Sequence, residues 1–240
     1  MVLLLSACQA SIRVGVDVNS DGSGAVSVTA HLDHDAAASY APYVRTSDLV
    51  KSGWKVTGPT AGAGGTVDFT ATKPFANPVQ AKAVVAELSG PSGPFRDLAI
   101  IRHPSFFQTK TTFQGTVDLT CGLTCFSDPQ LQQALGGAPN SGIEPSNLQA
   151  DAGIILDRIF QFEVAARLPG KVQSSNAPSQ VGNGAVWKIK LGQNAVVSAT
   201  SRSWNVVHIL AVVLGGLVVI AVVVVAILRL RRRPVAKHAA

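Results

Sequence analysis

The chain reads Phe107-Gln-Thr-Lys-Thr-Thr-Phe-Gln-Gly-Thr-Val-Asp-Leu119 near its middle. The odd-numbered positions of this stretch are apolar, Gly or Thr, whereas the even-numbered positions are all polar. A period of two is typical of a β-strand, whose side chains point alternately to two faces. A strand with one apolar and one wet face favours an antiparallel sheet. We therefore predict a long strand over Phe107–Leu119, with Lys110 and its even-numbered neighbours in solvent.

The same period recurs on both sides of this stretch. It predicts strands over residues 11–18, 26–32, 54–57, 66–71, 98–101, 160–168, 185–191 and 195–201. Residues 19–24 are rich in Asn, Asp, Gly and Ser, so they predict a hairpin turn between the first two strands. Gly62–Gly65 is expected at a second hairpin tip and lacks the following helix that a dinucleotide site requires.

Short helices are expected between the strands. The Ala-rich run 36–40 predicts one helix, and Asn77-Pro78 supplies an N-cap and a first-turn proline for a second, which ends before Gly90. A third is expected over residues 128–135, followed by a polar loop over 136–152. The predicted fold class is α+β, with a mostly antiparallel sheet and two or three short helices on one face.

A membrane span follows the last predicted strand. Ile209–Leu228 contains only apolar residues and Gly, and as a helix it would cover the hydrocarbon thickness of a bilayer. The basic residues that follow are Arg229, Arg231, Arg232, Arg233 and Lys237. Basic flanks stay in the cytoplasm. The sequence thus predicts a single transmembrane helix over 206–228 in the cell membrane, with Trp204 as an anchor at its outer interface.

The charge balance supports this division of the chain. The formal net charge is +6, from 20 basic and 14 acidic residues. Five basic residues follow Leu228, which leaves fifteen basic and fourteen acidic residues upstream, a net charge of +1. No basic cluster for nucleic acid is evident there. We therefore predict an extracytoplasmic α+β domain over 9–203, a basic cytoplasmic tail over 229–240, and no nucleic-acid partner.

The amino terminus contains a lipoprotein-like sequence. Leu5-Ser-Ala-Cys8 fits a lipobox, the short motif that precedes a lipidated cysteine, so Cys8 is the predicted lipidation site. A signal peptide needs a charged segment and an apolar segment of about 7–15 residues. Only Val2–Leu5 precede the box, so we expect residues 1–8 to be a truncated lipoprotein signal whose true start lies upstream.

The other two cysteines, Cys121 and Cys125, are separated by three residues. In an oxidising exterior such a pair can close a small disulfide across a turn, which Gly122 would help to bend. Free thiols and a catalytic pair are the alternatives. A metal site needs about four ligands and no His or Cys partner lies nearby in the sequence, and a thioredoxin-type centre has two intervening residues.

Candidate chemistry elsewhere is sparse. The densest group of potential metal ligands is His31, Asp33, His34 and Asp35. We interpret it as a polar strand end with an Asp that caps the following helix, the alternative being a metal site. His103 is interpreted as a loop histidine. The phosphate-loop and nucleophile-elbow motifs are absent from the sequence. We predict no catalytic residue, no metal and no cofactor, and hence no enzyme.

Most aromatic residues occur at strand spacing. They are Trp54, Phe69, Phe75, Phe107, Phe113, Phe160, Phe162 and Trp187. We expect most of them in the core and a minority in an apolar pocket of the kind that lipid-like ligands need.

Several short stretches occur in a recognisable order. They are Asp21–Gly24, Gly53–Val56, Thr72–Phe75, Gly115–Leu119, Arg167–Val172 and Ala185–Trp187. In this order, between a lipobox and a single apolar helix with a basic tail, the chain resembles the LppM-type domain family of actinobacterial envelope lipoproteins. The resemblance implies an envelope-anchored lipoprotein that engages cell-wall lipids or glycolipids, and it supplies no catalytic motif.

The predicted function is therefore non-covalent binding of lipid or glycolipid at the outer face of the cell membrane. The alternative is a scaffold that docks another envelope protein, with Gly215 and Gly216 allowing close helix approach. The sequence does not predict the ligand-binding residues or the oligomeric state.

Overall fold

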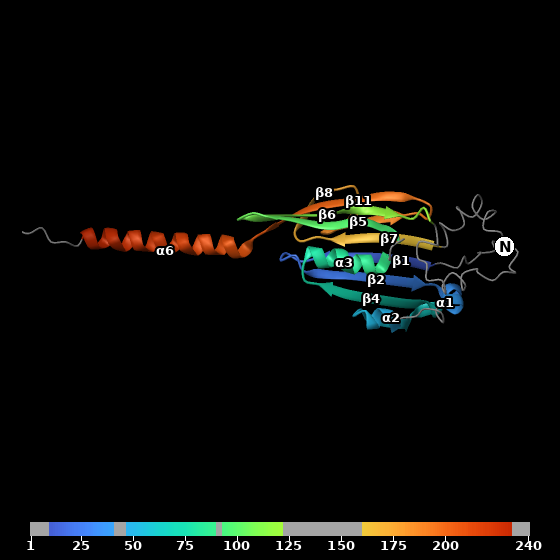
Figure 1. Cartoon of the computed structure of the whole chain (residues 1–240). Helices are drawn as coiled ribbons and strands as arrows, with labels where there is room; N and C mark the ends of the chain where they lie inside the picture. The colour runs from blue at the N-terminus through green and yellow to red at the C-terminus, as the bar shows by residue number, and fades with distance from the viewer. Residues whose placement is uncertain (1–9, 41–46, 90–92, 122–159, 232–240) are drawn as a thin grey trace, which may run out of the picture.

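The computed structural model describes residues 10–40, 47–89, 93–121 and 160–231, and their strands form two sheets (Figure 1). The seven-stranded sheet has the order β3-β4-β2-β1-β7-β10-β9. Its strands are β1 (Ala10–Val18), β2 (Gly24–Leu32), β3 (Lys55–Ala61), β4 (Val67–Phe75), β7 (Phe160–Arg167), β9 (Ser179–Val181) and β10 (Gly184–Ile189). The four-stranded sheet has the order β5-β6-β11-β8. Its strands are β5 (Phe95–Pro104), β6 (Gln108–Asp118), β8 (Lys171–Ser175) and β11 (Asn194–Trp204).

The predicted fold class is confirmed, with one difference in the sheets. Among the described strands, all pairs are antiparallel except β1 and β7, which run parallel. The strands form two sheets rather than one, because a period of two identifies the buried face of a strand but not its partner. The short strands β8 and β9 were not predicted, since they carry few alternating apolar residues.

The helices are α1 (His34–Tyr40), α2 (Ser47–Lys51), the 3-10 turn η2 (Ala63–Gly65), α3 (Pro78–Ser89) and α6 (Val206–Arg231). The predicted cap of α3 is confirmed, because Asn77 Oδ1 accepts the backbone N–H of Gln80 at 3.0 Å. The α3 helix contacts β5 of one sheet and β2 and β4 of the other. It therefore bridges the two sheets along one side (Figure 1). The predicted helix 128–135 and loop 136–152 lie outside the described residues.

The core lies between the two sheets. The rings of Phe113 and Trp187 are 5.9 Å apart, and those of Phe95 and Phe162 are 6.1 Å apart, each pair joining one sheet to the other. The predicted core aromatics Trp54, Phe69, Phe75, Phe113, Phe162 and Trp187 are buried. Phe160 is half-buried. Phe107 belongs to the minority expected outside the core, because β6 begins only at Gln108 and leaves Phe107 in the preceding turn, 49% exposed.

The apolar helix α6 extends away from the domain directly after β11 (Figure 1). Its segment Val206–Leu228 is long and apolar enough to cross a membrane, and none of it is buried. We call the end of the domain from which α6 leaves the helix end, and the opposite end the far end. The strand β1 starts with Ala10 at the far end (Figure 1).

The inter-sheet core gives a direct stability prediction. Phe113 is 1% exposed, so Phe113→Ala should leave a cavity and lower the free energy of unfolding by about 3–5 kcal/mol. Guanidinium titration of the full-length protein in detergent micelles, followed by tryptophan fluorescence, measures this change. The matched control is Gln114→Ala at the next, exposed position of β6, with an expected change within about 0.5 kcal/mol. Equal guanidinium midpoints of unfolding for Phe113→Ala and Gln114→Ala would contradict the packing of Phe113 between the two sheets.

Candidate functional site: a cleft at the helix end

The tip of the β5–β6 hairpin is fastened to the start of α6 by Asn205. The Asn205 Nδ2 group donates to the carbonyl of Ser105 at 2.5 Å and to that of Phe106 at 3.3 Å. Its backbone N–H donates to the carbonyl of Phe107 at 2.8 Å. Its Oδ1 accepts the hydroxyl of Thr109 at 3.0 Å. One side chain and its backbone thus hold the hairpin tip and the beginning of the helix as one unit.

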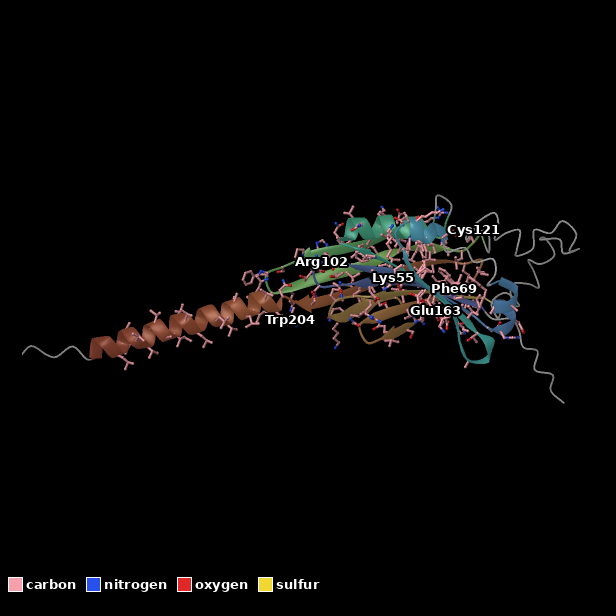
Figure 2. All side chains as sticks on the ribbon, turned by 90° about the horizontal axis from the view of Figure 1, so that it is seen from below. Lys55, Phe69, Arg102, Cys121, Glu163 and Trp204 are labelled. Atoms are coloured by element: carbon pink, nitrogen blue, oxygen red, sulfur yellow. The ribbon has the colours of Figure 1, made fainter. Side chains whose placement is uncertain are left out.

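Large aromatic side chains surround this junction. Phe106, Phe107 and Trp204 are 55%, 49% and 63% exposed. The Phe106 ring stands edge-on to Phe107 at 4.8 Å and lies 5.1 Å from the ring of His208, in the first turn of α6. Figure 2 shows Trp204 where the strands meet the helix. Aromatic residues that are exposed and clustered beside an apolar helix indicate a contact surface rather than a core.

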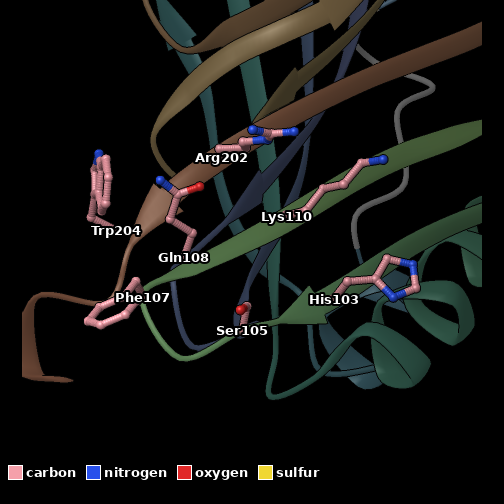
Figure 3. Close-up of a pocket in the computed structure, with 7 residues that line it drawn as sticks. All are labelled: His103, Ser105, Phe107, Gln108, Lys110, Arg202 and Trp204. Atoms are coloured by element: carbon pink, nitrogen blue, oxygen red, sulfur yellow. The ribbon is translucent and has the colours of Figure 1, made fainter. Parts of the chain in front are cut away.

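An open cleft of about 490 Å³ lies beside these aromatics, on the outer face of the four-stranded sheet (Figure 3). It is lined by His103, Ser105, Phe107, Gln108, Lys110, Arg202 and Trp204. In Figure 3, the basic side chains stand on the strands while Phe107 and Trp204 form the rim next to α6. The cleft therefore combines apolar surface on its helix side with positive charge on the other.

The positive charge is organised by strand register. His103 is paired with Lys110, Lys110 with Arg202, and Arg202 with Lys171. Cross-strand partners share a face, so we call His103, Lys110, Arg202 and Lys171 the basic row. All four are exposed. The alternate side chains of β6 and β11, which point to the core, are buried: Thr109, Thr111, Ser201 and Ser203. At strand spacings of about 4.8 Å the row is about 14 Å wide.

The turn between β7 and β8 brings Lys171 into this row. The Ser201 hydroxyl donates to the carbonyl of Pro169 at 2.9 Å. Gly170 has a φ of 77°, and a Cβ there would lie 2.2 Å from the carbonyl oxygen of Arg202. Only glycine permits this close approach, which holds the turn against β11.

The basic row has no acidic partner among the residues that the structure describes. Ion pairs elsewhere in the described part of the chain involve other basic side chains, among them Arg13, His31, Lys73, Arg96, Arg167 and Lys188. Like charges on adjacent strands repel one another. A bound anion would relieve this repulsion, so the row is chemically suited to an anionic group.

The predicted cysteine sites lie elsewhere or outside the described residues. Cys121 follows β6 at the far end (Figure 2) and is disulfide-bonded. Its predicted partner Cys125 and the predicted lipidation site Cys8 are outside the described part of the chain. The Cys121–Cys125 pairing and the lipidation of Cys8 therefore stay predictions.

The His31–Asp35 group is divided between structural roles. His31 Nδ1 lies 2.6 Å from Asp68 Oδ1 on the neighbouring strand. Asp33 Oδ1 accepts the backbone N–H of Ala36 at 2.8 Å, which confirms the predicted helix cap. Within the described ranges, no group of three or more His, Cys, Asp or Glu side chains is placed to hold a metal.

The cleft residues were only partly visible in the sequence. The solvent-facing position of Lys110 is confirmed. The assignment of His103 to a loop is wrong, since β5 continues to Pro104 and carries it into the cleft. Arg202 and Lys171 were missed, because they join the basic row only through register. The sequence could have indicated the position of Arg202, because it lies two residues before Trp204 and therefore on the same face of the strand.

Comparison with known proteins gives one distant likeness. No family model matches the sequence, and no curated protein matches it. The structure is similar to the NMR structure of the folded domain of LppM from Mycobacterium tuberculosis, with a TM-score of 0.43 and 15% sequence identity. The match covers 85% of this chain and 96% of that domain. A likeness this distant does not establish membership of the LppM-type family, which stays a prediction.

The junction gives a local prediction. Asn205→Ala removes three side-chain hydrogen bonds, so the free energy of unfolding should fall by about 1–3 kcal/mol. Hydrogen exchange of the full-length protein should become faster at the amides around Phe107 and stay unchanged in β1. The control is Gln161→Ala, an exposed position on β7. Unchanged exchange around Phe107 in Asn205→Ala would contradict the proposed fastening.

Proposed function

We propose that this chain is a single-span envelope protein whose extracytoplasmic domain binds lipid or glycolipid non-covalently at the outer surface of the cell membrane. One observation carries the proposal: the exposed aromatics and the cleft lie at the helix end, beside the start of α6. An exposed apolar cluster in that place suits a lipid surface better than bulk water.

Helix length supports this placement. The segment Val206–Leu228 has 23 residues, and at 1.5 Å per residue it measures about 34 Å. The hydrocarbon layer is about 30 Å thick, and the headgroup layers add about 5–7 Å on each side. Val206 would then lie close to the boundary of the hydrocarbon, with Trp204 in the headgroup layer. Tryptophan is enriched at this depth in membrane proteins.

Charge and covalent chemistry support the orientation. The basic residues after Leu228 favour a cytoplasmic tail and hence an external domain. A disulfide at Cys121 is consistent with a domain on the outer side of the membrane, since disulfides persist in oxidising compartments.

The proposed mechanism is binding without chemistry. Phe107 and Trp204 would bury apolar surface against the glycerol and upper acyl region. Ser105, Gln108 and Lys110 line the cleft beside them and would contact the headgroup. This is the pattern of a binding site with an apolar lining and a few polar groups, and we propose a binding module rather than an enzyme.

The predicted lipid on Cys8 would leave the domain from the other end. Cys8 is two residues from Ala10, which is about 7 Å of extended chain. The nine residues of β1 extend about 30 Å from the far end. An acyl chain on Cys8 and α6 could therefore enter one leaflet only if the domain lay along the membrane. The domain is therefore either upright and anchored by α6 alone, or lies along the membrane and is anchored at both ends. An experiment can separate these two arrangements.

Photo-crosslinking tests the proposal. The full-length protein in nanodiscs that contain lipids with photoreactive headgroups should form adducts on peptides with Phe107 and Trp204. Phe107→Ala combined with Trp204→Ala should lower the yield several-fold, because apolar contact is lost. Val196→Ala, an exposed position nearer the far end of β11, is the control.

Adducts confined to α6 would contradict lipid binding by the domain. Adducts along the whole domain, including the start of β1, would support a domain lying on the membrane instead. A single dominant protein adduct in native membranes, without domain–lipid adducts, would favour the scaffold alternative.

A further inference from the structure

We infer that the basic row binds the phosphate groups of anionic lipids in the leaflet where α6 begins. This inference deepens the proposed function and rests on its placement of the helix end at the membrane surface. It names a ligand class for the cleft, a lipid with a negatively charged headgroup, and assigns Lys110 and Arg202 as its central contacts.

The first support is the direction of the row. The row crosses β5, β6, β11 and β8, and is therefore perpendicular to the strands. The helix α6 continues roughly along the direction of the strands (Figure 1). When α6 crosses a bilayer, the row is parallel to the membrane surface, and its cations share one depth. The phosphates of a leaflet also lie in one plane, so several cations can contact them together.

The second support is depth. Arg202 precedes Trp204 by two residues on the extended strand β11, which is about 7 Å. With Trp204 at the inner boundary of the headgroup layer, which is about 5–7 Å thick, the row lies at the outer surface of that layer, where anionic phosphates are accessible. Phe107 and Trp204 lie at one side of the cleft, and Lys110 and Arg202 lie further along the strands (Figure 3). With α6 in a bilayer, the aromatic rim is on the side toward the hydrocarbon and the cations are on the side toward water. This order matches the order of groups in an anionic phospholipid.

The third support is the chemistry of the cations. Lys110 and Arg202 are direct cross-strand neighbours, so an ammonium and a guanidinium lie side by side in the cleft. A guanidinium can hold a phosphate through two parallel hydrogen bonds, and an ammonium adds a point charge. Lys171 extends the positive charge on one side, and the imidazole of His103 adds a polar group on the other. Each basic residue near an anionic surface raises the binding affinity about fivefold.

A lipid is the favoured occupant over a soluble anion. The cleft is open, and its apolar rim is continuous with the exposed surface of α6. A free phosphate would leave Phe107 and Trp204 without a partner, whereas a lipid uses both halves of the cleft.

Native mass spectrometry of the full-length protein in detergent tests the inference, with phosphatidylglycerol and phosphatidylcholine as probes. Lys110→Gln combined with Arg202→Gln should weaken phosphatidylglycerol binding roughly 25-fold, from about fivefold for each charge. Phosphatidylcholine binding should stay unchanged. The matched control, Lys55→Gln with Lys82→Gln, removes the same charge at exposed positions away from the cleft. The basic tail is present in every variant, so its contribution cancels.

Charge-preserving Lys110→Arg with Arg202→Lys should retain phosphatidylglycerol binding, which separates loss of charge from loss of fold. Equal phosphatidylglycerol affinity in the two Gln double variants would overturn the inference. Displacement of the lipid by millimolar inorganic phosphate would overturn the lipid as occupant. If both lipids bind equally and only the aromatic variants weaken them, the proposed function stands and this inference fails. If neither the charge variants nor the aromatic variants of the cleft change the binding of either lipid, both the proposed function and this inference fail.

Discussion

The pairing of β6 with β11 is the constraint on which the rest of the molecule depends. It runs without a register shift from Asp118 opposite Asn194 to Gln108 opposite Trp204. This register turns Phe113 toward the other sheet and Lys110 toward solvent, beside Arg202. Its last pair ends directly before α6, so the ladder also sets the direction in which the helix leaves. A one-residue slip would move every one of these side chains to the opposite face.

Sequence pattern predicted the parts of this architecture that depend on local periodicity. The wet face of β6, the hairpin before Gly24 and the cap at Asn77 all follow from spacing within a few residues. The pattern failed where the period ends, as at Phe107, which lies in a turn. It also could not reveal the basic row, because Lys110 and Lys171 are brought together by strand pairing across a long stretch of chain. Periodicity predicts the face of the strand on which a side chain lies, whereas register determines which side chains it contacts on the neighbouring strands.

The helix end shows why a domain and a membrane span need not behave as independent parts. Asn205 uses both its side chain and its backbone to join the hairpin tip to the first turn of α6. The helix start, the aromatic residues and the cations follow one another in this order, which gives the cleft a defined depth relative to a bilayer. We regard this fixed depth as the property that would let a shallow, open cleft select a headgroup.

The most direct test of the account is the depth of the domain relative to the membrane. Paramagnetic relaxation by a nitroxide-headgroup lipid can be measured on the backbone amides of the full-length protein in nanodiscs. An upright domain predicts strong broadening at Phe107 and Gln108, and little at Thr116, which is about 27 Å further along β6. Broadening that is uniform along β6, or absent at Phe107, would contradict the placement of the helix end at the lipid surface.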